Sequence, residues 1–189
     1  MSASSENADV TGWPRRGKLE RDKPNGEIME GFEKVDVYGI SFDVASKQPI
    51  VLLKVEGKNR FLPIWIGHPE AAAILMKLQN AELPRPMTHD LLAAVVEHLS
   101  ASVARVLVTE LRENTFYAVL HLNAAGEEVQ VDSRPSDAIA LAVRTESPIF
   151  VSSELLETNG IEFEQEVEDV EEIVKEFKEF LDQVTPEDF

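Results

Sequence analysis

Apolar and polar residues alternate in two long stretches of the chain, and a period of two is typical of β-strands with one buried face. The first stretch predicts three strands. One starts at Phe32 and bends near Gly39, and the other two are Ile50–Val55 and Arg60–Ile66. The second predicts three more, at Val103–Leu111, Thr115–Leu122 and Glu128–Asp132. Short turns containing Gly or Asn separate them, so we expect a mostly antiparallel sheet.

Each group of three strands is followed by an apolar segment that a proline opens, which is typical of a helix. Pro69 begins the first, which Ala71–Leu78 continue. Pro135 begins the other, and its Ala138–Val143 segment is apolar on every side, so we expect it to be buried. Between them, Thr88 is a suitable N-cap for a helix whose apolar stripe is expected to pack against the sheet: Leu91, Leu92, Val95, Val96 and Leu99. A short strand at Pro148–Val151 follows, and Ser152 or Ser153 caps a short helix that ends at Gly160.

The order of three strands and an Ala-rich helix occurs twice, at Phe32–Leu78 and at Val103–Arg144. Duplication of a β-β-β-α unit is one interpretation and coincidence is the other. Either way the pattern predicts an α+β fold, with a mostly antiparallel sheet covered on its inner face by helices. The sequence therefore predicts three regions: a flexible polar arm at residues 1–31, a domain at 32–160 and a C-terminal helix at 161–189.

The C-terminal region combines an apolar stripe at helical spacing with acidic residues at nearly every other position. Val170, Val174, Phe177 and Leu181 belong to this stripe. Such an amphipathic helix docks on its own domain, on a neighbouring subunit or on a different protein, and the sequence leaves these three open. Its acidic outer face is not expected to contact nucleic acid.

Composition narrows the classes of function. The chain has 189 residues, of which 43% are apolar, and a net charge of −17. Residues 154–189 account for −12 of this charge, since they contain two Lys and fourteen Asp or Glu. The central part is therefore only mildly acidic, so charge alone does not exclude a phosphate ligand. The absence of Cys excludes disulfides, cysteine-ligated zinc and thiol nucleophiles. No apolar run approaches the roughly 20 residues of a membrane span, and no secretory signal is recognisable, so we expect a cytoplasmic protein.

Charged residues gather at the starts of the predicted helices. Their positions are Glu70 in the first helix, Arg85, His89 and Asp90 around the second, and Asp132, Arg134 and Asp137 around the buried one. A structural interpretation exists for each: acids in a first turn favour the helix dipole, and Arg134 and Asp137, three apart, pair with each other. The functional interpretation is that they converge, since carboxylates hold Mg²⁺ or Mn²⁺, arginines clamp phosphate, and a histidine serves as base. Phosphodiester hydrolysis needs these parts.

Four ordered motifs resemble the bifunctional nuclease domain family. They read FLPIWIG at 61–67 followed by Glu70, PRPMTHDLL at 84–92, TFYA at 115–118 and DSRPSDAIALA at 132–142. The resemblance spans about residues 32–156. It implies an α+β fold, a tendency to form homo-oligomers and degradation of both DNA and RNA.

Two classes of function remain. The first is a nuclease of low sequence specificity that acts on DNA and RNA with a divalent metal, Mg²⁺ or Mn²⁺. Here Asp90, Asp132 and Asp137 are catalytic acids on the metal side together with Glu70, His89 is a base, and Arg85 and Arg134 bind substrate phosphate. The second is a non-catalytic, oligomeric interaction or regulatory module that binds a protein partner through the acidic C-terminal helix. A small-ligand binder that uses the same arginines is a third, more general interpretation.

Overall fold

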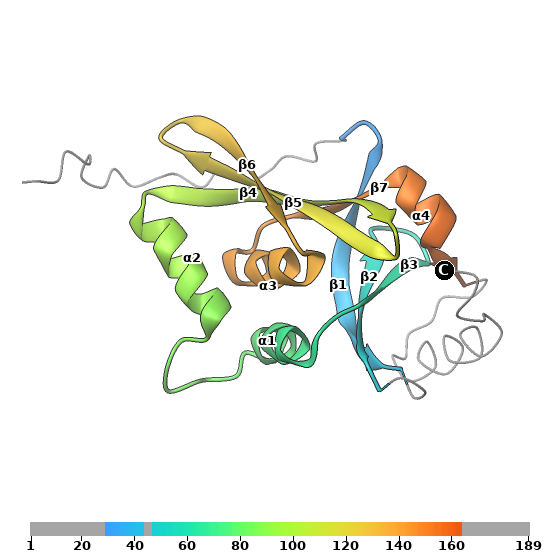
Figure 1. Ribbon diagram of the computed structural model, residues 1–189, viewed down its shortest axis with the longest axis horizontal. Helices are drawn as coiled ribbons and strands as arrows, with labels where there is room; N and C mark the ends of the chain where they lie inside the picture. The colour runs from blue at the N-terminus through green and yellow to red at the C-terminus, as the bar shows by residue number, and fades with distance from the viewer. Residues whose placement is uncertain (1–28, 44–46, 164–189) are drawn as a thin grey trace, which may run out of the picture.

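The computed structural model describes residues 29–43 and 47–163 and contains every strand and helix expected between residues 32 and 160 (Figure 1). The elements are, in chain order, β1 (Phe32–Phe42), β2 (Pro49–Val55), β3 (Arg60–Trp65), α1 (His68–Leu78), α2 (Thr88–His98), β4 (Ala101–Arg112), β5 (Thr115–Ala124), β6 (Glu127–Ser133), α3 (Pro135–Thr145), β7 (Ile149–Ser152), α4 (Ser153–Asn159) and β8 (Ile161–Glu162). The sequence did not predict β8, whose two residues are too few for a periodic pattern.

One eight-stranded sheet carries the fold, in the order β6-β5-β4-β7-β1-β2-β3-β8. All neighbouring strands are antiparallel except β4 and β7, which are parallel. The expected bend in β1 is a bulge between Val37 and Gly39. The predicted α+β class with a mostly antiparallel sheet is therefore confirmed.

The two halves of the sheet follow the same order, β1-β2-β3-α1 and β4-β5-β6-α3, and β7 joins them. Figure 1 shows the halves at a steep angle to each other, with α1 and α3 in the space between them. The first turns of both helices therefore reach the same region of the inner face.

Helix α3 lies at the centre of the core, as its all-apolar sequence predicts. Its residues 138–142 are each at most 1% exposed, and they pack with inner-face side chains of both halves of the sheet, such as Val51 and Val106. Burial of one Ile or Leu side chain contributes about 1.5–3 kcal/mol, so this helix fixes the position of its first turn strongly.

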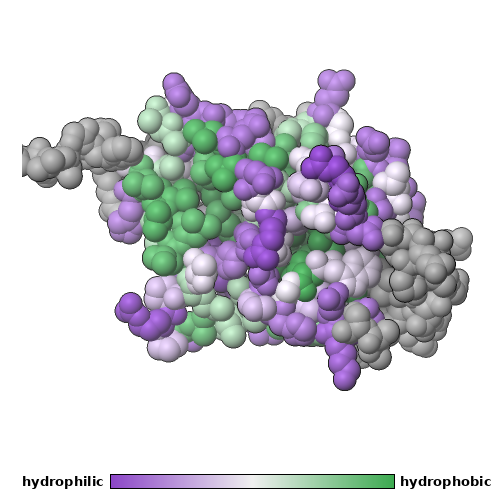
Figure 2. Space-filling view, in the orientation of Figure 1, coloured by the Kyte–Doolittle hydropathy of each residue, from purple (hydrophilic) through white to green (hydrophobic). Residues whose placement is uncertain are grey.

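The prediction for the apolar stripe of α2 is wrong. Four of its five residues, Leu91, Leu92, Val95 and Leu99, are 40–57% exposed, and only Val96 and Ala93 pack against the core. The physical reason is position, because α1 and α3 already cover the inner face and α2 lies beside α3 at the start of β4. Helical spacing identifies an apolar face but not what covers it. Figure 2 shows apolar side chains gathered over α2 and toward the β4–β6 end of the sheet.

The start of α2 differs by one residue from the expected cap. Met87 is the N-cap and Thr88 the first helical residue, and the backbone N–H of Met87 donates to the Asp90 carboxylate at 2.8 Å. Residues 1–28 of the expected arm and residues 164–189 of the expected C-terminal helix lie outside the described residues. Among the described helices, none is long and apolar enough to cross a membrane.

Candidate functional site

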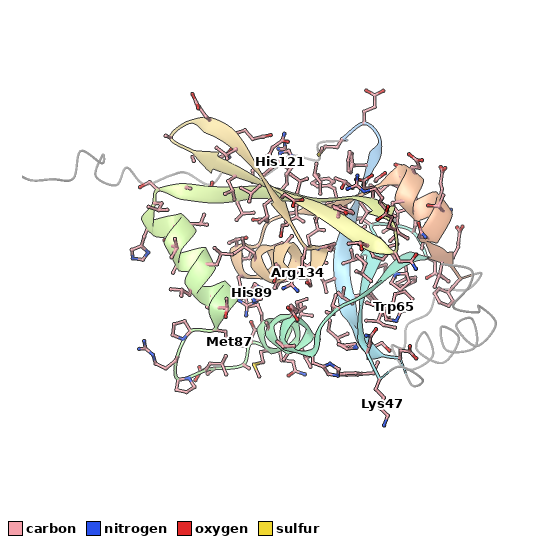
Figure 3. The ribbon with its side chains drawn as sticks, viewed as in Figure 1. Lys47, Trp65, Met87, His89, His121 and Arg134 are labelled. Carbon is pink, nitrogen blue, oxygen red and sulfur yellow. The ribbon has the colours of Figure 1, made fainter. Side chains whose placement is uncertain are left out.

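The first turns of α1, α2 and α3 meet at one cluster of four side chains, Glu70, His89, Arg134 and Asp137, which we call the Arg134 cluster. Glu70 lies in the first turn of α1 and Asp137 in that of α3, while Arg134 is the N-cap of α3. Figure 3 shows His89 and Arg134 in the space between the three helices. The sequence analysis expected seven residues to converge, and the structure brings together four of them.

Arg134 holds two carboxylates at once. Its Nε donates to Asp137 Oδ2 at 2.8 Å, and its Nη2 donates to Glu70 Oε1 at 2.7 Å and to Asp137 Oδ1 at 3.1 Å. Its Nη1 has no hydrogen-bond partner within residues 29–43 and 47–163, and 65% of the side chain is exposed. One edge of the guanidinium is therefore fixed by the protein, while the other edge faces outward.

The charges of the cluster stabilise one another. Burial raises the pKa of the Asp137 carboxyl, but hydrogen bonds from Arg134 and His89 outweigh this and bring it below its ordinary value. The same carboxyl, followed by that of Glu70, raises the pKa of the Arg134 guanidinium. The Asp137 carboxylate and the Arg134 guanidinium are consequently charged at neutral pH.

His89 supports Asp137 from the other side. Its Nε2 lies 3.1 Å from Asp137 Oδ1, and its side chain is nearly buried. Because an ionised carboxylate accepts hydrogen bonds but cannot donate them, Nε2 must carry the proton in this contact. His89 thereby acts on the orientation of Asp137, so the structure favours a positioning role for it.

Asp90, the neighbour of His89, belongs to a different pair. Its Oδ1 accepts a hydrogen bond from Arg144 Nε at 2.6 Å, and its Oδ2 accepts the Met87 N–H. Burial raises the pKa of the Asp90 carboxyl, and the hydrogen bonds from Met87 and Arg144 lower it below its usual value. Asp90 thus connects α2 to α3 and is not a member of the Arg134 cluster.

Asp132 and Arg85 are not members of the Arg134 cluster. Asp132 is an exposed residue of the edge strand β6, opposite Val119 of β5, and Arg85 lies in the exposed segment between α1 and α2. Neither makes an ion pair or side-chain hydrogen bond in the part of the chain that the structure describes. The sequence could not separate these two residues from the others, because proximity to a predicted helix start does not fix the side-chain direction.

The acids proposed for Mg²⁺ or Mn²⁺ do not fit a metal centre as they are arranged. The cluster contains two carboxylates and one guanidinium, and such an excess of acidic groups attracts cations. However, Glu70 and Asp137 already bind Arg134, and Asp90 binds Arg144. Within the described residues no group of three or more His, Asp or Glu side chains is placed to hold a metal ion. The donor set that divalent cations prefer is therefore not presented here.

A cavity of about 650 Å³ opens beside the cluster. It lies between the end of β3, the β4–β5 hairpin, the start of α3 and the segment after α4, and Trp65, Phe116, Arg134 and Ser136 are among its lining residues. Its size is that of a pocket for a small organic ligand.

Two residues near this site were not predicted. Arg144 is a cation in the last turn of α3, a helix that the sequence predicts to be buried. Because a buried charge requires a partner, this position could have indicated that Arg144 forms an ion pair. Ser136 was part of a recognised motif, but nothing in the sequence indicates that this residue lines a cavity.

Comparison with known proteins identifies the family. The profile of the bifunctional nuclease domain matches residues 51–164, which is more than half of the chain. The uncharacterized protein Rv1829 of Mycobacterium tuberculosis is 40% identical over 162 residues, which cover 82% of this chain and 97% of that protein. Bifunctional nuclease 1 of Oryza sativa subsp. japonica is 31% identical over 126 residues, 65% of this chain and 38% of the rice protein. Bifunctional nuclease 1 of Arabidopsis thaliana is 31% identical over 122 residues, 63% of this chain and 38% of the plant protein. The chain belongs to the bifunctional nuclease domain family.

Proposed function

We propose that the chain is a nuclease that hydrolyses phosphodiester bonds in DNA and RNA with low sequence specificity, and that the Arg134 cluster is its active site. One observation carries the proposal: in a member of this family, Arg134 is fixed between two carboxylates, has donors left over, and is among the residues that line a cavity. A fixed guanidinium with free donors suits a phosphate oxygen. The relatives named bifunctional nucleases support the reaction class.

In the proposed reaction, Nη1 of Arg134 donates to a non-bridging phosphate oxygen while Nε and Nη2 stay on the carboxylates. Asp137, of which 31% of the side chain is exposed, takes a proton from a water molecule. The water oxygen forms a bond to phosphorus, the bond from phosphorus to the leaving oxygen breaks, and solvent protonates the leaving oxygen. His89 holds Asp137 in place through Nε2. A positioned carboxylate base contributes about 10²- to 10⁴-fold to such a rate.

Low sequence specificity agrees with these two groups, because a guanidinium and a carboxylate that act on the backbone phosphate do not distinguish one base from another. The divalent metal stays a prediction. No step above is assigned to it, and cleavage in the presence of a chelator tests it directly. Full activity in chelator would contradict the predicted metal and leave the assignment of the Arg134 cluster intact.

The test uses highly purified full-length protein with labelled single-stranded DNA, duplex DNA and RNA, with and without Mg²⁺ or Mn²⁺. We expect the wild-type chain to cleave and Asp137→Asn to lose at least about a hundredfold in rate with its fold unchanged. Asp36→Asn, an exposed carboxylate on β1, is the matched control and keeps the wild-type rate. Asp132→Asn is included because the sequence analysis counted Asp132 among the catalytic acids, and its position outside the cluster favours wild-type activity.

A chain that cleaves no substrate under any metal condition would overturn the nuclease proposal. Equal rates in Asp36→Asn and Asp137→Asn would also contradict it, because a general effect on folding would explain an equal loss and a contaminating enzyme would explain two unchanged rates.

A second candidate, the non-catalytic interaction module, is favoured by a separate observation. The exposed stripe of α2 is the kind of apolar surface that monomeric proteins rarely leave open. The C-terminal helix, to which the sequence analysis assigned the partner contact, lies outside the described residues. Light scattering after gel filtration measures the subunit number that this candidate and the predicted homo-oligomer require, and a monomer at all concentrations would count against both.

A further inference from the structure

Both faces of the sheet are apolar along β2. Val51 and Leu53 belong to the main core with residues of α1 and α3. Ile50 and Leu52 alternate with them and therefore lie on the opposite, outer face. There they pack with Phe61 of β3 in a second apolar cluster, which we call the outer cluster, and each of these three residues is at most 1% exposed. The outer face is thus a second core and not a solvated surface.

No described helix contributes to the outer cluster. The residues that border it are Tyr38 of β1, Trp65 of β3, Ile161 of β8 and Phe163, which directly follows β8. They belong to the sheet or adjoin it, whereas α1, α3 and α4 place their buried apolar residues in the main core. In Figure 1, α1, α2 and α3 all lie on one side of β1. Because a sheet face with fully buried side chains needs a second layer, this layer comes from outside residues 29–43 and 47–163.

The chain leaves the described residues at this surface. The backbone N–H of Phe163 donates to the Asn59 carbonyl at 3.0 Å, and Asn59 Nδ2 donates to the Phe163 carbonyl at 2.8 Å. The ring of Phe163 meets the ring of Phe61 edge to face, with the two centroids 5.4 Å apart. Residue 163 is therefore fixed against the outer cluster, and the segment that follows starts there.

That segment has the pattern of the missing layer. Residues 167–184 carry the apolar stripe of the predicted C-terminal helix, and acidic residues occupy most of the opposite face. A helix of this length measures about 27 Å, and the seven residues of β2 span about 23 Å. With a diameter of about 10 Å, such a helix covers about two neighbouring strands. The segment thus matches the outer face of β2 and β3 in size and in apolar character.

The short connection favours this surface over other partners for the stripe. Residues 164–166 join Phe163 to Val167 and reach at most about 10 Å. A tether of this length gives an effective concentration in the millimolar range, which a separate protein or a second copy rarely reaches. The exposed stripe of α2 is the other apolar surface, and Figure 1 shows α2 and α4 at opposite ends of the described structure. The outer cluster is therefore the apolar surface nearest to the tether.

Charge complementarity favours the same surface. Lys54 lies on the same face of β2 as Ile50 and Leu52, and its Nζ is 5.5 Å from the ring centroids of both Tyr38 and Phe61. Residues 164–189 contain eleven Asp or Glu and two Lys. A carboxylate at the border of the apolar stripe therefore has a cation on the sheet with which it can pair.

We propose that residues 167–184 form a helix that docks on their own domain, with the apolar stripe on Ile50, Leu52 and Phe61 at the outer face of β2 and β3. The acidic face of the helix is then turned to solvent. Because docking buries the stripe, the stripe is not available to a protein partner or to a neighbouring subunit. Trp65 borders the outer cluster and also lines the cavity beside the Arg134 cluster, so the docked helix lies next to that cavity.

The fluorescence of Trp65 tests this in the full-length chain, in which Trp13→Phe leaves Trp65 as the single tryptophan. In this background Phe177→Gln removes an apolar residue from the stripe, and Lys178→Gln, its neighbour on the polar face, is the matched control. We expect Phe177→Gln to increase the quenching of Trp65 by acrylamide at least about twofold and to lower the midpoint of urea unfolding. Lys178→Gln should leave both quantities unchanged.

A milder pair of variants, Leu181→Ala and Asp182→Ala, repeats the comparison if Phe177→Gln fails to fold. Dilution of the background protein over about a hundredfold range separates a helix docked on its own domain from one exchanged with a second copy, because only the exchange depends on concentration. We expect the quenching of Trp65 to stay constant on dilution.

Equal quenching and equal unfolding midpoints within both pairs of variants would overturn the proposal, because a different segment or partner would then cover the outer cluster. Quenching that rises on dilution would overturn docking on the same domain and assign the helix to a second copy. Neither measurement involves nucleic acid, so its outcome is independent of the proposed nuclease activity.

Discussion

Arg144 provides a sharp test of the division between structural and functional residues in this site. Its side chain is only 5% exposed and donates three hydrogen bonds, to Asp90 Oδ1 at 2.6 Å, to the Ala140 carbonyl at 2.8 Å and to the Ala73 carbonyl at 3.1 Å. These bonds connect α3 to both α1 and α2. Replacement of Arg144 by Met keeps the aliphatic part of the side chain and removes the charge and the donors.

The expected loss of unfolding free energy in Arg144→Met follows from the burial of the ion pair between Arg144 and Asp90. Removal of one partner from a fully buried ion pair costs about 3–5 kcal/mol, because the other charge stays unpaired. Asp90 is 34% exposed, so water compensates part of this loss, and a single hydrogen bond to a charged group is worth about 1.5–3 kcal/mol. We therefore expect Arg144→Met to lower the free energy of unfolding by about 2–3 kcal/mol at pH 7.

The effect depends on pH in a defined direction. The pKa of Asp90 in the folded protein lies below its unfolded value of about 3.9, so its pairing stabilises the fold above that value and is lost as the pH falls through the folded pKa. The gap between wild type and Arg144→Met should narrow in acid. Urea unfolding at pH 7 and pH 3 measures this difference in unfolding free energy. The control is Arg85→Met, which replaces an exposed arginine and should stay within about 0.5 kcal/mol of wild type. A stability of Arg144→Met equal to that control would refute the structural role of the pair.

Three further predictions concern the cluster and the exposed helix. Gly67→Ala places a methyl group against the Glu70 carboxylate, so the Glu70 side chain must shift relative to Arg134. We expect lower nuclease activity with thermal stability nearly unchanged, and unaltered activity would count against a role for Glu70. The lowered pKa of Asp137 means that its stabilising effect is lost as the pH falls below about 3.9, so the difference in unfolding free energy between wild type and Asp137→Asn should shrink between pH 6 and pH 2, and a constant difference would contradict it. Leu91→Gln and Leu99→Gln should change the free energy of unfolding by less than about 1 kcal/mol, which chemical denaturation measures, whereas a larger loss would mean that α2 is covered within the monomer.

Much of the fold could be predicted because its strongest signals are local. The alternation in β1 and around β4–β6, the prolines that open α1 and α3, and the all-apolar α3 each specify an element through its own residues. The surroundings of α2 could not be predicted this way, because its apolar stripe looks the same whether a sheet covers it or not. The parallel contact of β4 with β7 also depends on the tertiary arrangement alone.

The site was predictable only in part, for a similar reason. Of the seven residues that the sequence analysis grouped, Glu70, His89, Arg134 and Asp137 do lie together, because the first turns of three helices meet. Asp90 lies next to His89 in sequence, yet on a helix consecutive side chains point about 100° apart, so one reaches Asp137 and the other reaches Arg144. The identity of a partner on another helix is information that a single sequence does not contain.

The assignment of the Arg134 cluster as a nuclease site is tested most directly by the cleavage rate of Arg134→Lys on a labelled single-stranded oligonucleotide. Lysine keeps the positive charge but cannot bind two carboxylates and a phosphate oxygen at once. The account predicts a rate reduced about a hundredfold or more, with the wild-type unfolding temperature and subunit number. A wild-type rate in Arg134→Lys, measured on the same purified peak, would contradict it.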